Sequence, residues 1–396
     1  MATVFRIPHA GGAGTHIELL VSMLTRKRIF KGLICGNNLR QTSSRKLGYL
    51  ISRLMNADNA RVRLLEPTVE RVAKSIAKLS RTGAGDDLVI HCHDPLSTCA
   101  ALRSGIQGAA VIQTVHGPWS KENQGSGLGP GTAFNRAIQR LEEKAFAAAH
   151  LLLPVDRGQA AILQKEFGVE ERRIRVIENA VDVERLGAVH AVYHSARMPI
   201  HYFLVPRRLV PKNGVEFAIR GFARIGHHDA GLVIAGAGFL RRSLEKLSRE
   251  LGVSGRVKFL GEVPRERLLP LMKRSEAVVV PSVPADGVVE ATSLSVLEAM
   301  AIGVPVIGSA IGGINEIIAD DSMGFLTPPR DPEAISRAME AVLALDETSR
   351  GAVVQNALSR VREKFGSEAW IERIVSLYQE ALGKAPRMPD TQSFSQ

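Results

Sequence analysis

Residues 290–300 read EATSLSVLEAM and lie between two short apolar runs, Ala277–Val280 and Val304–Ile307. Ser293 or Ser295 can cap a helix that occupies most of this stretch, because a serine hydroxyl accepts hydrogen bonds from the first free N–H groups of a helix. A strand, a helix and a second strand in this order form the repeating unit of a parallel sheet covered by helices. The stretch therefore predicts an α/β fold.

The same alternation of short apolar runs and longer amphipathic segments extends along the chain in both directions. Strands are predicted in the first half at residues 4–7, 32–35, 88–91, 111–115, 150–154 and 174–177, and in the second half at residues 202–205, 231–234, 257–260, 277–280 and 304–307. Two such series, separated by an irregular stretch, predict two doubly wound, Rossmann-like domains. Ligands of such sheets bind at the carboxyl ends of the strands, so we expect the site in a central cleft between the domains.

Composition narrows the classes of protein. The chain has 396 residues, of which 45% are hydrophobic, and its net charge is 51 − 40 = +11. No apolar run approaches the roughly 18–20 residues of a membrane span, and no secretory signal pattern opens the sequence. Three cysteines without a C-x-x-C pair fit reduced thiols, so we expect a cytoplasmic protein. With only 5% aromatic residues and no basic run interleaved with stacking side chains, nucleic acid is not the expected partner.

Glycine-rich turns after strands are places where phosphates bind. Residues 11–14 (GGAG) and 236–238 (GAG) are such turns, but Ile17 and Arg241 stand where a dinucleotide fingerprint needs its third small residue. No P-loop occurs either, so hydride transfer and P-loop phosphotransfer are disfavoured. What remains is a helix start near Gly12 that could hold an anion or form an ordinary tight turn.

The functional prediction rests on two acids within residues 290–300. Glu290 precedes the predicted helix and Glu298 lies one to two turns inside it. The free N–H groups at Ser293 to Ser295 would face a diphosphate, Glu290 could accept sugar hydroxyls, and Glu298 could accept ribose hydroxyls. The same spacing also fits two solvated acids on a surface helix.

The wider context of these acids resembles the retaining GT-B glycosyltransferases of family 4. The resemblance extends over most of the chain, and it is carried by residues 178–182 (ENAVD), 257–263 (VKFLGEV), 281–282 (PS), 286–307 around the two acids, 312–316 (GGINE) and 324–326 (GFL). It implies an N-terminal acceptor-binding domain over residues 1–190 and a C-terminal nucleotide-sugar-binding domain over 191–365. It also implies a helix at 366–383 that returns to the first domain; residues 384–396 are expected to be a disordered tail.

The resemblance also assigns roles within residues 207–214 (RRLVPKNG). Arg208 and Lys212 would hold the donor diphosphate and stabilise the charge that develops on it, although Lys212 stands one residue before the position where the family's lysine usually lies. Gly236, Val263 and Leu294 are implied at the donor site together with Gly12, Ser293, Ser295 and Glu298. His116, at the end of a first-domain strand, would orient the donor sugar.

A metal is not expected. His91 and His93 share one face of a strand at i and i+2, but no third ligand stands at a suitable spacing. The sequence also lacks an Asp-x-Asp pair, through which other sugar transferases hold a divalent ion on the diphosphate. The expectation is transfer that needs no metal and no other cofactor.

Two segments are amphipathic. Residues 40–55 carry leucines and an isoleucine at helical spacing, with basic residues beside them. This segment either contacts the inner face of an anionic membrane or packs on its own domain. Near the other end, Trp370, Ile371, Ile374, Val375 and Tyr378 form a stripe that we expect to be core.

Together these observations predict an enzyme of the hexosyltransferase class (EC 2.4). It would move a hexosyl group, with retention, from a nucleotide diphosphate sugar, most simply UDP-linked, to an acceptor hydroxyl in polysaccharide or glycolipid biosynthesis. The alternatives are a nucleotide-sugar 2-epimerase of the same fold, a transferase acting on a small-molecule acceptor, and a sugar-nucleotide-binding protein without activity.

Overall fold

The computed structural model describes residues 1–4, 12–36, 57–81, 87–122, 131–191, 199–285 and 290–383. Its contacts divide the chain into two compact units, one formed by Met1–Glu178 with Glu368–Gln396 and the other by Asn179–Ser367. Three predictions lie outside the described residues: the membrane-contacting segment 40–55, most of the first predicted strand, and the tail 384–396. The acceptor-binding and donor-binding roles of the two halves stay predictions.

The first unit contains a parallel sheet of three strands in the order β1-β2-β3. Isolated bridges from Ala2 to Cys92, from Ala2 to Ile34 and from Leu152 to Ile174 continue the parallel arrangement at both edges. Its elements are α1 (Gly12–Arg26), α3 (Ala57–Ser80), β1 (Val89–Cys92), α4 (Pro95–Arg103), β2 (Ala110–Val115), α5 (Trp119–Glu122), α6 (Ala133–Ala148), β3 (Leu151–Pro154), α7 (Arg157–Phe167) and α16 (Ser367–Gly383).

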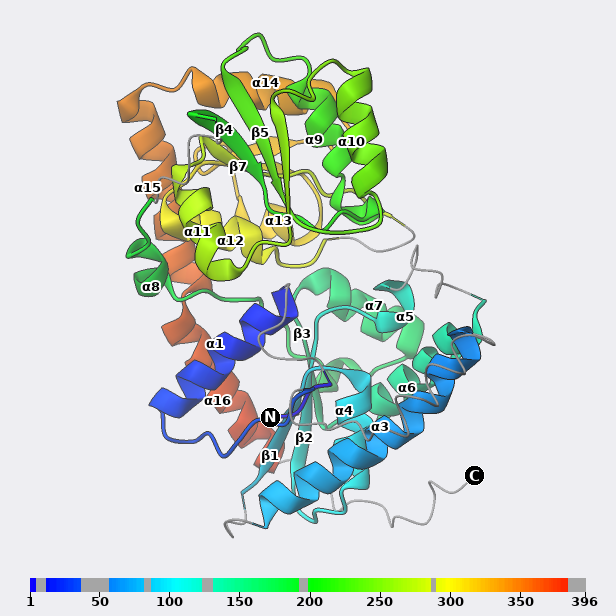
Figure 1. The fold of residues 1–396 in the computed structure, drawn as a ribbon. Helices are drawn as coiled ribbons and strands as arrows, with labels where there is room; N and C mark the ends of the chain where they lie inside the picture. The colour runs from blue at the N-terminus through cyan, green and yellow to red at the C-terminus, as the bar shows by residue number, and fades with distance from the viewer. Residues whose placement is uncertain are drawn as a thin grey trace. The chain divides into compact units, whose positions relative to one another are not determined.

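Alternation along β1 gives this sheet two different faces. Ile90 and Cys92 enter a hydrophobic core with α3, α4 and α6. His91 points to the other face, where its Nδ1 lies 2.7 Å from the hydroxyl of Tyr378 on α16. In Figure 1, α1 and α16 cover one side of β1–β3 and α3, α4 and α6 cover the other. The stripe predicted as core on α16 is confirmed at Trp370, Ile371 and Ile374, which are buried.

The second unit is built on a fully parallel sheet of six strands in the order β6-β5-β4-β7-β8-β9. Its elements are α8 (Val183–Gly187), β4 (His201–Val205), α9 (Val215–Phe222), β5 (Ala230–Ala235), α10 (Arg241–Glu250), β6 (Val257–Gly261), α11 (Arg265–Arg274), β7 (Ala277–Val280), α12 (Leu294–Ile302), β8 (Val306–Ser309), α13 (Gly312–Ile317), β9 (Phe325–Thr327), α14 (Pro332–Leu343) and α15 (Glu347–Phe365). This is the doubly wound order, in which the sequence of strands reverses between β4 and β7.

Successive residues of β4 enter opposite cores, as the period of a strand requires. Tyr202 and Leu204 pack with residues of α11, α12, α13 and α15. Phe203 and Val205 pack with residues of α9, α10 and α14. Because both faces are covered, the strands read as continuous apolar runs rather than as alternating ones.

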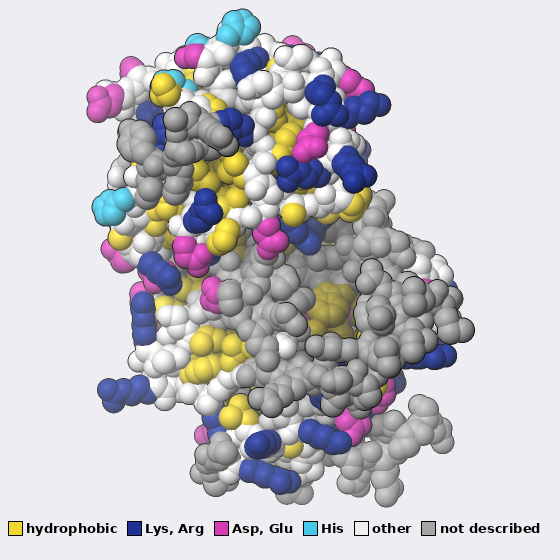
Figure 2. All heavy atoms as spheres, viewed as in Figure 1, with side chains coloured by type: hydrophobic (Ala, Val, Ile, Leu, Met, Phe, Trp, Pro, Cys, Tyr) yellow, Lys and Arg dark blue, Asp and Glu magenta, His cyan; other side chains and the backbone are white. Residues whose placement is uncertain are grey.

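The predicted strands from residue 88 to 154 and from 202 to 307 are confirmed, with ends displaced by at most two residues. The strands predicted at 32–35 and at 174–177 are each only an isolated bridge, at Ile34 and at Ile174, and β9 was not among the predicted strands. Within the described residues, none of the helices combines the length and the apolar character that a membrane crossing requires. On the face drawn in Figure 2, the described basic side chains are dispersed among acidic ones.

Candidate active site

The candidate site of the second unit lies where its sheet changes direction. β4 and β7 are hydrogen-bonded neighbours, and the strand order reverses between them. Arg207 and Arg208 follow the carboxyl end of β4, and Ser282 follows the carboxyl end of β7. Ligands of doubly wound sheets bind at such a reversal, because the loops that leave the two strands turn to opposite faces.

A bidentate ion pair between Arg207 and Glu290 lies at this point. Nη1 of Arg207 donates to Oε1 of Glu290 at 2.9 Å, and Nη2 donates to Oε2 at 2.6 Å. The two side chains are only 11% and 12% exposed. Planar guanidinium and carboxylate groups in this arrangement fix each other in orientation as well as in charge.

Two polar neighbours complete the network around the guanidinium. Nη2 of Arg207 also donates to Oδ1 of Asn213 at 2.6 Å and to Oγ of Ser282 at 3.0 Å. Ser282 lies 3.3 Å from Oε2 of Glu290, and Nδ2 of Asn213 donates to the carbonyl of Arg208. The loops after β4 and β7 are therefore held together through one carboxylate.

The carboxyl of Glu290 is kept ionised by these cations. Burial acts to raise the pKa of Glu290, but the charge of Arg207, its hydrogen bonds and the charge of Lys212 outweigh burial, so the pKa lies below its ordinary value. The backbone carbonyl of Glu290 is fixed as well, because it accepts from the N–H of Gly313. Glu290 thus presents an oriented, negatively charged acceptor.

Gly236, which is predicted to contact the donor, lies in the loop after β5, and the structure shows why this position needs a glycine. A Cβ at position 236 would lie 1.9 Å from the carbonyl oxygen of Arg207. The absence of a side chain at this position therefore lets the two neighbouring loops approach closely enough to place Arg207.

We expect Gly236→Ala to destabilise the second unit, because the arginine loop must move away from the new methyl group. Overpacking of this kind costs about 1–3 kcal/mol in the free energy of unfolding. The matched control is Gly255→Ala, where a Cβ would meet nothing within 4 Å. The two variants are compared by urea denaturation, and equal midpoints would contradict the crowding argument.

The two cations predicted to bind the diphosphate differ in their surroundings. Arg208 is exposed, and no hydrogen bond or ion pair joins its side chain to another residue in the described parts of the chain. Lys212 lies in the 3₁₀ turn Pro211–Asn213 and is half-buried, close enough to Glu290 for its charge to lower the pKa of that carboxyl. Asn213, which stands where the family's lysine usually lies, instead supports Arg207.

The start of α12 is close to the predicted arrangement. Ser293 is the N-cap residue, Leu294 is the first helical residue and Ser295 is the second. The hydroxyl of Ser293 makes no capping hydrogen bond, so the prediction of a serine side-chain cap is wrong for this residue. That hydroxyl is buried and has no hydrogen-bond partner among the described residues, which leaves it able to bond a ligand at the helix start.

Glu298 is anchored inside the same helix by Arg265, the first residue of α11. Nε and Nη2 of Arg265 donate to Oε1 of Glu298 at 2.9 and 2.7 Å. Burial raises the pKa of Glu298 and outweighs the opposing effect of Arg265. Val263, also predicted at the donor site, is half-buried two residues before Arg265 and packs on the core beneath α12.

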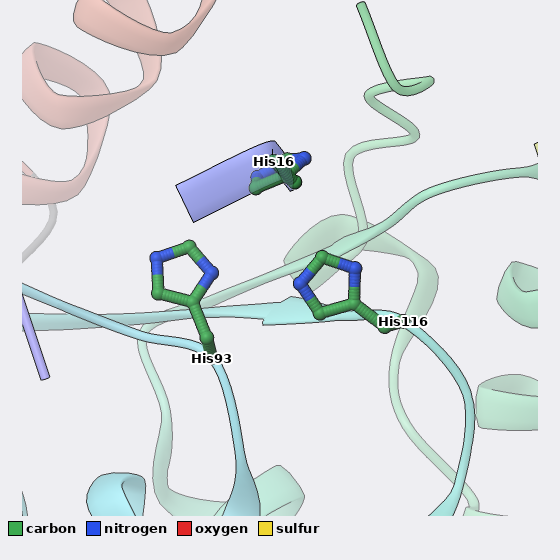
Figure 3. Close-up of side chains that lie close together, drawn as sticks. All are labelled: His16, His93 and His116. Carbon is green, nitrogen blue, oxygen red and sulfur yellow. The ribbon is translucent and has the colours of Figure 1, made fainter. Parts of the chain in front are cut away.

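The remaining predicted residues belong to the first unit. Gly12 is the exposed first residue of α1. His116 follows β2 and lies in a cluster with His16 of α1 and His93, which follows β1. The ring centroids of His16 and His116 are 4.8 Å apart, and those of His93 and His116 are 5.8 Å apart (Figure 3).

Sequence analysis missed three residues of these arrangements. Arg207 was passed over for its neighbour Arg208, because the sequence does not show which of the two adjacent arginines is buried against an acid. Arg265 carries no motif, and its pairing with Glu298 depends on the packing of α11 against α12. His16 was not considered because it is far in sequence from His93 and His116.

Comparison with known proteins agrees with this architecture. Residues 10–185 match the family described as Glycosyltransferase Family 4, and residues 197–360 match Glycosyl transferases group 1. An uncharacterized glycosyltransferase of Methanocaldococcus jannaschii is 30% identical over 317 residues, which cover 77% of this chain and 78% of the relative. A D-inositol 3-phosphate glycosyltransferase of Acidothermus cellulolyticus is 28% identical over 312 residues, 75% of this chain and 68% of the relative.

Among solved structures, HepE of Anabaena in complex with UDP and glucose superimposes with a TM-score of 0.69 at 16% identity, covering 96% of this chain and 99% of that one. The fold is therefore that of the GT-B glycosyltransferases, and the predicted fold class and family are confirmed. The chain belongs to the group 1, family 4 glycosyltransferases.

Proposed function

We propose that this glycosyltransferase moves a hexosyl group, with retention of configuration, from a UDP-linked sugar to an acceptor hydroxyl. The observation that carries the proposal is the convergence at one end of a doubly wound sheet of Arg208, Lys212, the start of α12 and the oriented carboxylate of Glu290. Two cations and a helix start suit a diphosphate, and a fixed carboxylate suits the hydroxyls of a sugar. The UDP and glucose named for HepE support this choice of donor.

The ion pair of Glu290 with Arg207 favours a mechanism in which the diphosphate leaves and the acceptor attacks on the same face of the sugar, without a covalent sugar–enzyme intermediate. Both of its oxygens accept from Arg207, which makes the carboxylate a weak nucleophile and a good orienting group. In the proposed step, the bond from the anomeric carbon to the diphosphate oxygen breaks while the acceptor oxygen bonds to the same face of that carbon. The acceptor proton passes to the departing diphosphate oxygen, whose new charge Arg208 and Lys212 stabilise.

The diphosphate is proposed to be neutralised by these side chains without a divalent ion. The acceptor is proposed to be a growing polysaccharide or a glycolipid, bound by the first unit. A small-molecule acceptor is the second candidate, and the D-inositol 3-phosphate glycosyltransferase among the relatives favours it.

The first experiment is a melting-temperature panel with UDP, GDP, ADP and their common sugar conjugates. A ligand that binds only the native state stabilises it by about 2.7 kcal/mol at a concentration near 100 times its Kd. We expect a rise with the UDP series. A rise confined to another base would overturn the proposed donor.

The second experiment follows the products of the sugar conjugate that shifts the melting temperature. Nuclear magnetic resonance of the product made with an acceptor library should show the anomeric configuration of the donor. An inverted product would contradict retention. Nucleotide released with a rearranged sugar, in the absence of acceptor, would identify a 2-epimerase, and binding without turnover would identify a protein that only binds the sugar nucleotide.

A further inference from the structure

The segment between Glu290 and α12 is held by hydrogen bonds at both of its ends. The carbonyl of Glu290 accepts from the N–H of Gly313 at 3.1 Å. Two residues later, the carbonyl of Thr292 accepts from Nδ2 of Asn179 at 3.0 Å. Thr292 directly precedes Ser293, the N-cap residue of α12. Asn179 therefore acts on the start of the helix to which the proposed function assigns the diphosphate.

Asn179 lies on a firmly held stretch of backbone. It is the first residue of the second unit and is 6% exposed. Two residues further on, the N–H of Val181 donates to the carbonyl of Phe365 at 2.9 Å, and the carbonyl of Val181 accepts from the N–H of Ser367 at 3.0 Å. The side chain of Val181 belongs to the same hydrophobic core as Leu294 of α12. The carboxamide of Asn179 is thus held in place beside the helix start.

The hydrogen bond from Asn179 orients a whole peptide group. A peptide bond is planar and trans, so the C=O of Thr292 and the N–H of Ser293 point in opposite directions. Fixing the carbonyl on Asn179 therefore directs the N–H of Ser293 away from the asparagine. The next N–H groups lie in the first turn of α12, where a helix offers them no internal partner. The direction of this set of donors is fixed at the peptide that Asn179 holds.

The start of α12 lacks the usual side-chain cap, which makes the external hydrogen bond more important. A serine at the N-cap ordinarily accepts from an N–H of the first turn. Ser293 makes no such bond, and its buried Oγ has no hydrogen-bond partner within the ranges that the structure describes. The first turn is left able to bond a ligand, while the peptide before it is oriented by Asn179.

We propose that Asn179 is a positioning residue for the donor. Its carboxamide fixes the peptide between Thr292 and Ser293, and so the direction in which α12 presents its first N–H groups to the diphosphate. Asn179 acts through the helix start and not by contact with the donor. The inference rests on the proposed function and concerns the binding of the phosphates, not of the base. Residues 178–182, which carried only the family resemblance in the sequence, thereby gain a function.

The test compares UDP, which carries the diphosphate, with uridine, which lacks it. Asn179→Leu removes the donating N–H and keeps a side chain of similar size. A misplacement of about 1 Å can cost about 100-fold, so we expect the Kd of UDP to rise by about 10–100-fold and that of uridine to stay nearly unchanged. Calorimetry gives the Kd of UDP, and a displacement titration gives that of uridine. If the melting panel assigns another base, its diphosphate and nucleoside replace UDP and uridine.

Tyr202→Phe is the matched control, because it also removes one buried hydrogen bond from a side chain to a backbone carbonyl. The hydroxyl of Tyr202 on β4 donates to the carbonyl of Leu271 on α11 at 2.7 Å. Neither residue belongs to the proposed donor site, so this variant should keep the UDP affinity of the native chain. Asn179→Ala gives the same comparison if Asn179→Leu does not fold.

Two results with the Asn179 variants would overturn the proposal. One is UDP binding as tight as that of the native chain. The other is an equal loss for UDP and uridine, which would mean a general disturbance of the site. A native chain that binds none of the nucleoside diphosphates would refute the proposed function, and the role of Asn179 with it. That failure appears in the native chain, whereas a failure of this inference alone appears only in the variants.

Discussion

Arg208→Ala is expected to lower kcat by about 10²–10³-fold, the effect of removing one group that stabilises developing charge in a transition state. The reason is the charge that appears on the diphosphate as it leaves the sugar. Arg208 is exposed and bonds no other side chain among the described residues, so its guanidinium is available for this charge. The measurement is steady-state kinetics with the sugar nucleotide identified by the melting panel.

The structure of Arg208→Ala should be unchanged, because truncation of an exposed side chain usually alters stability by less than about 0.5 kcal/mol. Arg242→Ala is the control, an exposed arginine of the same unit on α10, and it should keep the full rate. An Arg208→Ala variant with undiminished kcat would remove Arg208 from the proposed mechanism and leave Lys212 as the remaining candidate.

The doubly wound character of the chain could be predicted from its apolar runs. Strands such as β7 and β8 are buried on both faces, and sequences of this kind are short, apolar and bounded by turns. β9 was missed because it has only three residues, Phe325–Thr327, two of which are half-buried. A run so short carries no periodicity that could distinguish it from a loop.

The site was predictable where a local motif carried it. Glu290, Glu298 and the start of α12 lie in one continuous stretch, and the helix predicted there begins after Ser293, although the serine hydroxyl makes no capping hydrogen bond. The donor-binding roles of the two acids came from the family resemblance and stay predictions. The partners Arg207 and Arg265 were not found, because each choice of partner depends on how one loop or helix packs against another. Nothing in residues 207–208 distinguishes the arginine that turns inward from the one that faces solvent.

The histidine cluster shows the same limit over a longer separation in the chain. His91 and His93 were recognised as sharing one face of a strand, and their stacked rings confirm it. A third histidine was sought at a nearby spacing, whereas the fold brings His116 from the end of the next strand and His16 from a helix more than seventy residues away. Parallel strands place their carboxyl ends at one edge of a sheet, and this rule could have joined His93 to His116 in advance.

Arg207→Met is expected to lower the free energy of unfolding of the second unit by about 3–5 kcal/mol, the usual cost of removing one partner from a buried ion pair. The variant leaves the Glu290 carboxylate in a site from which water is largely excluded. Arg207→Met combined with Glu290→Leu removes both charges and should recover most of the loss, so the double variant should be more stable than either single one. Both tryptophans lie in the first unit, so hydrogen exchange of peptides from β4 and β7 in urea is the suitable measurement.

Two further comparisons separate the ion pair from a general effect of losing charge. Lys246→Met breaks an exposed pair with Glu250 on α10 and should cost at most about 0.5 kcal/mol. Because the folded pKa of Glu290 is lowered, the stabilisation from its ion pair is present above the ordinary pKa of 4.5 and is lost as the pH falls through the lowered folded value. The stabilities of the native chain and of Arg207→Met should therefore converge in acid, whereas a difference that stayed constant with pH would mean that packing of the arginine stem, and not its charge, holds the two loops together.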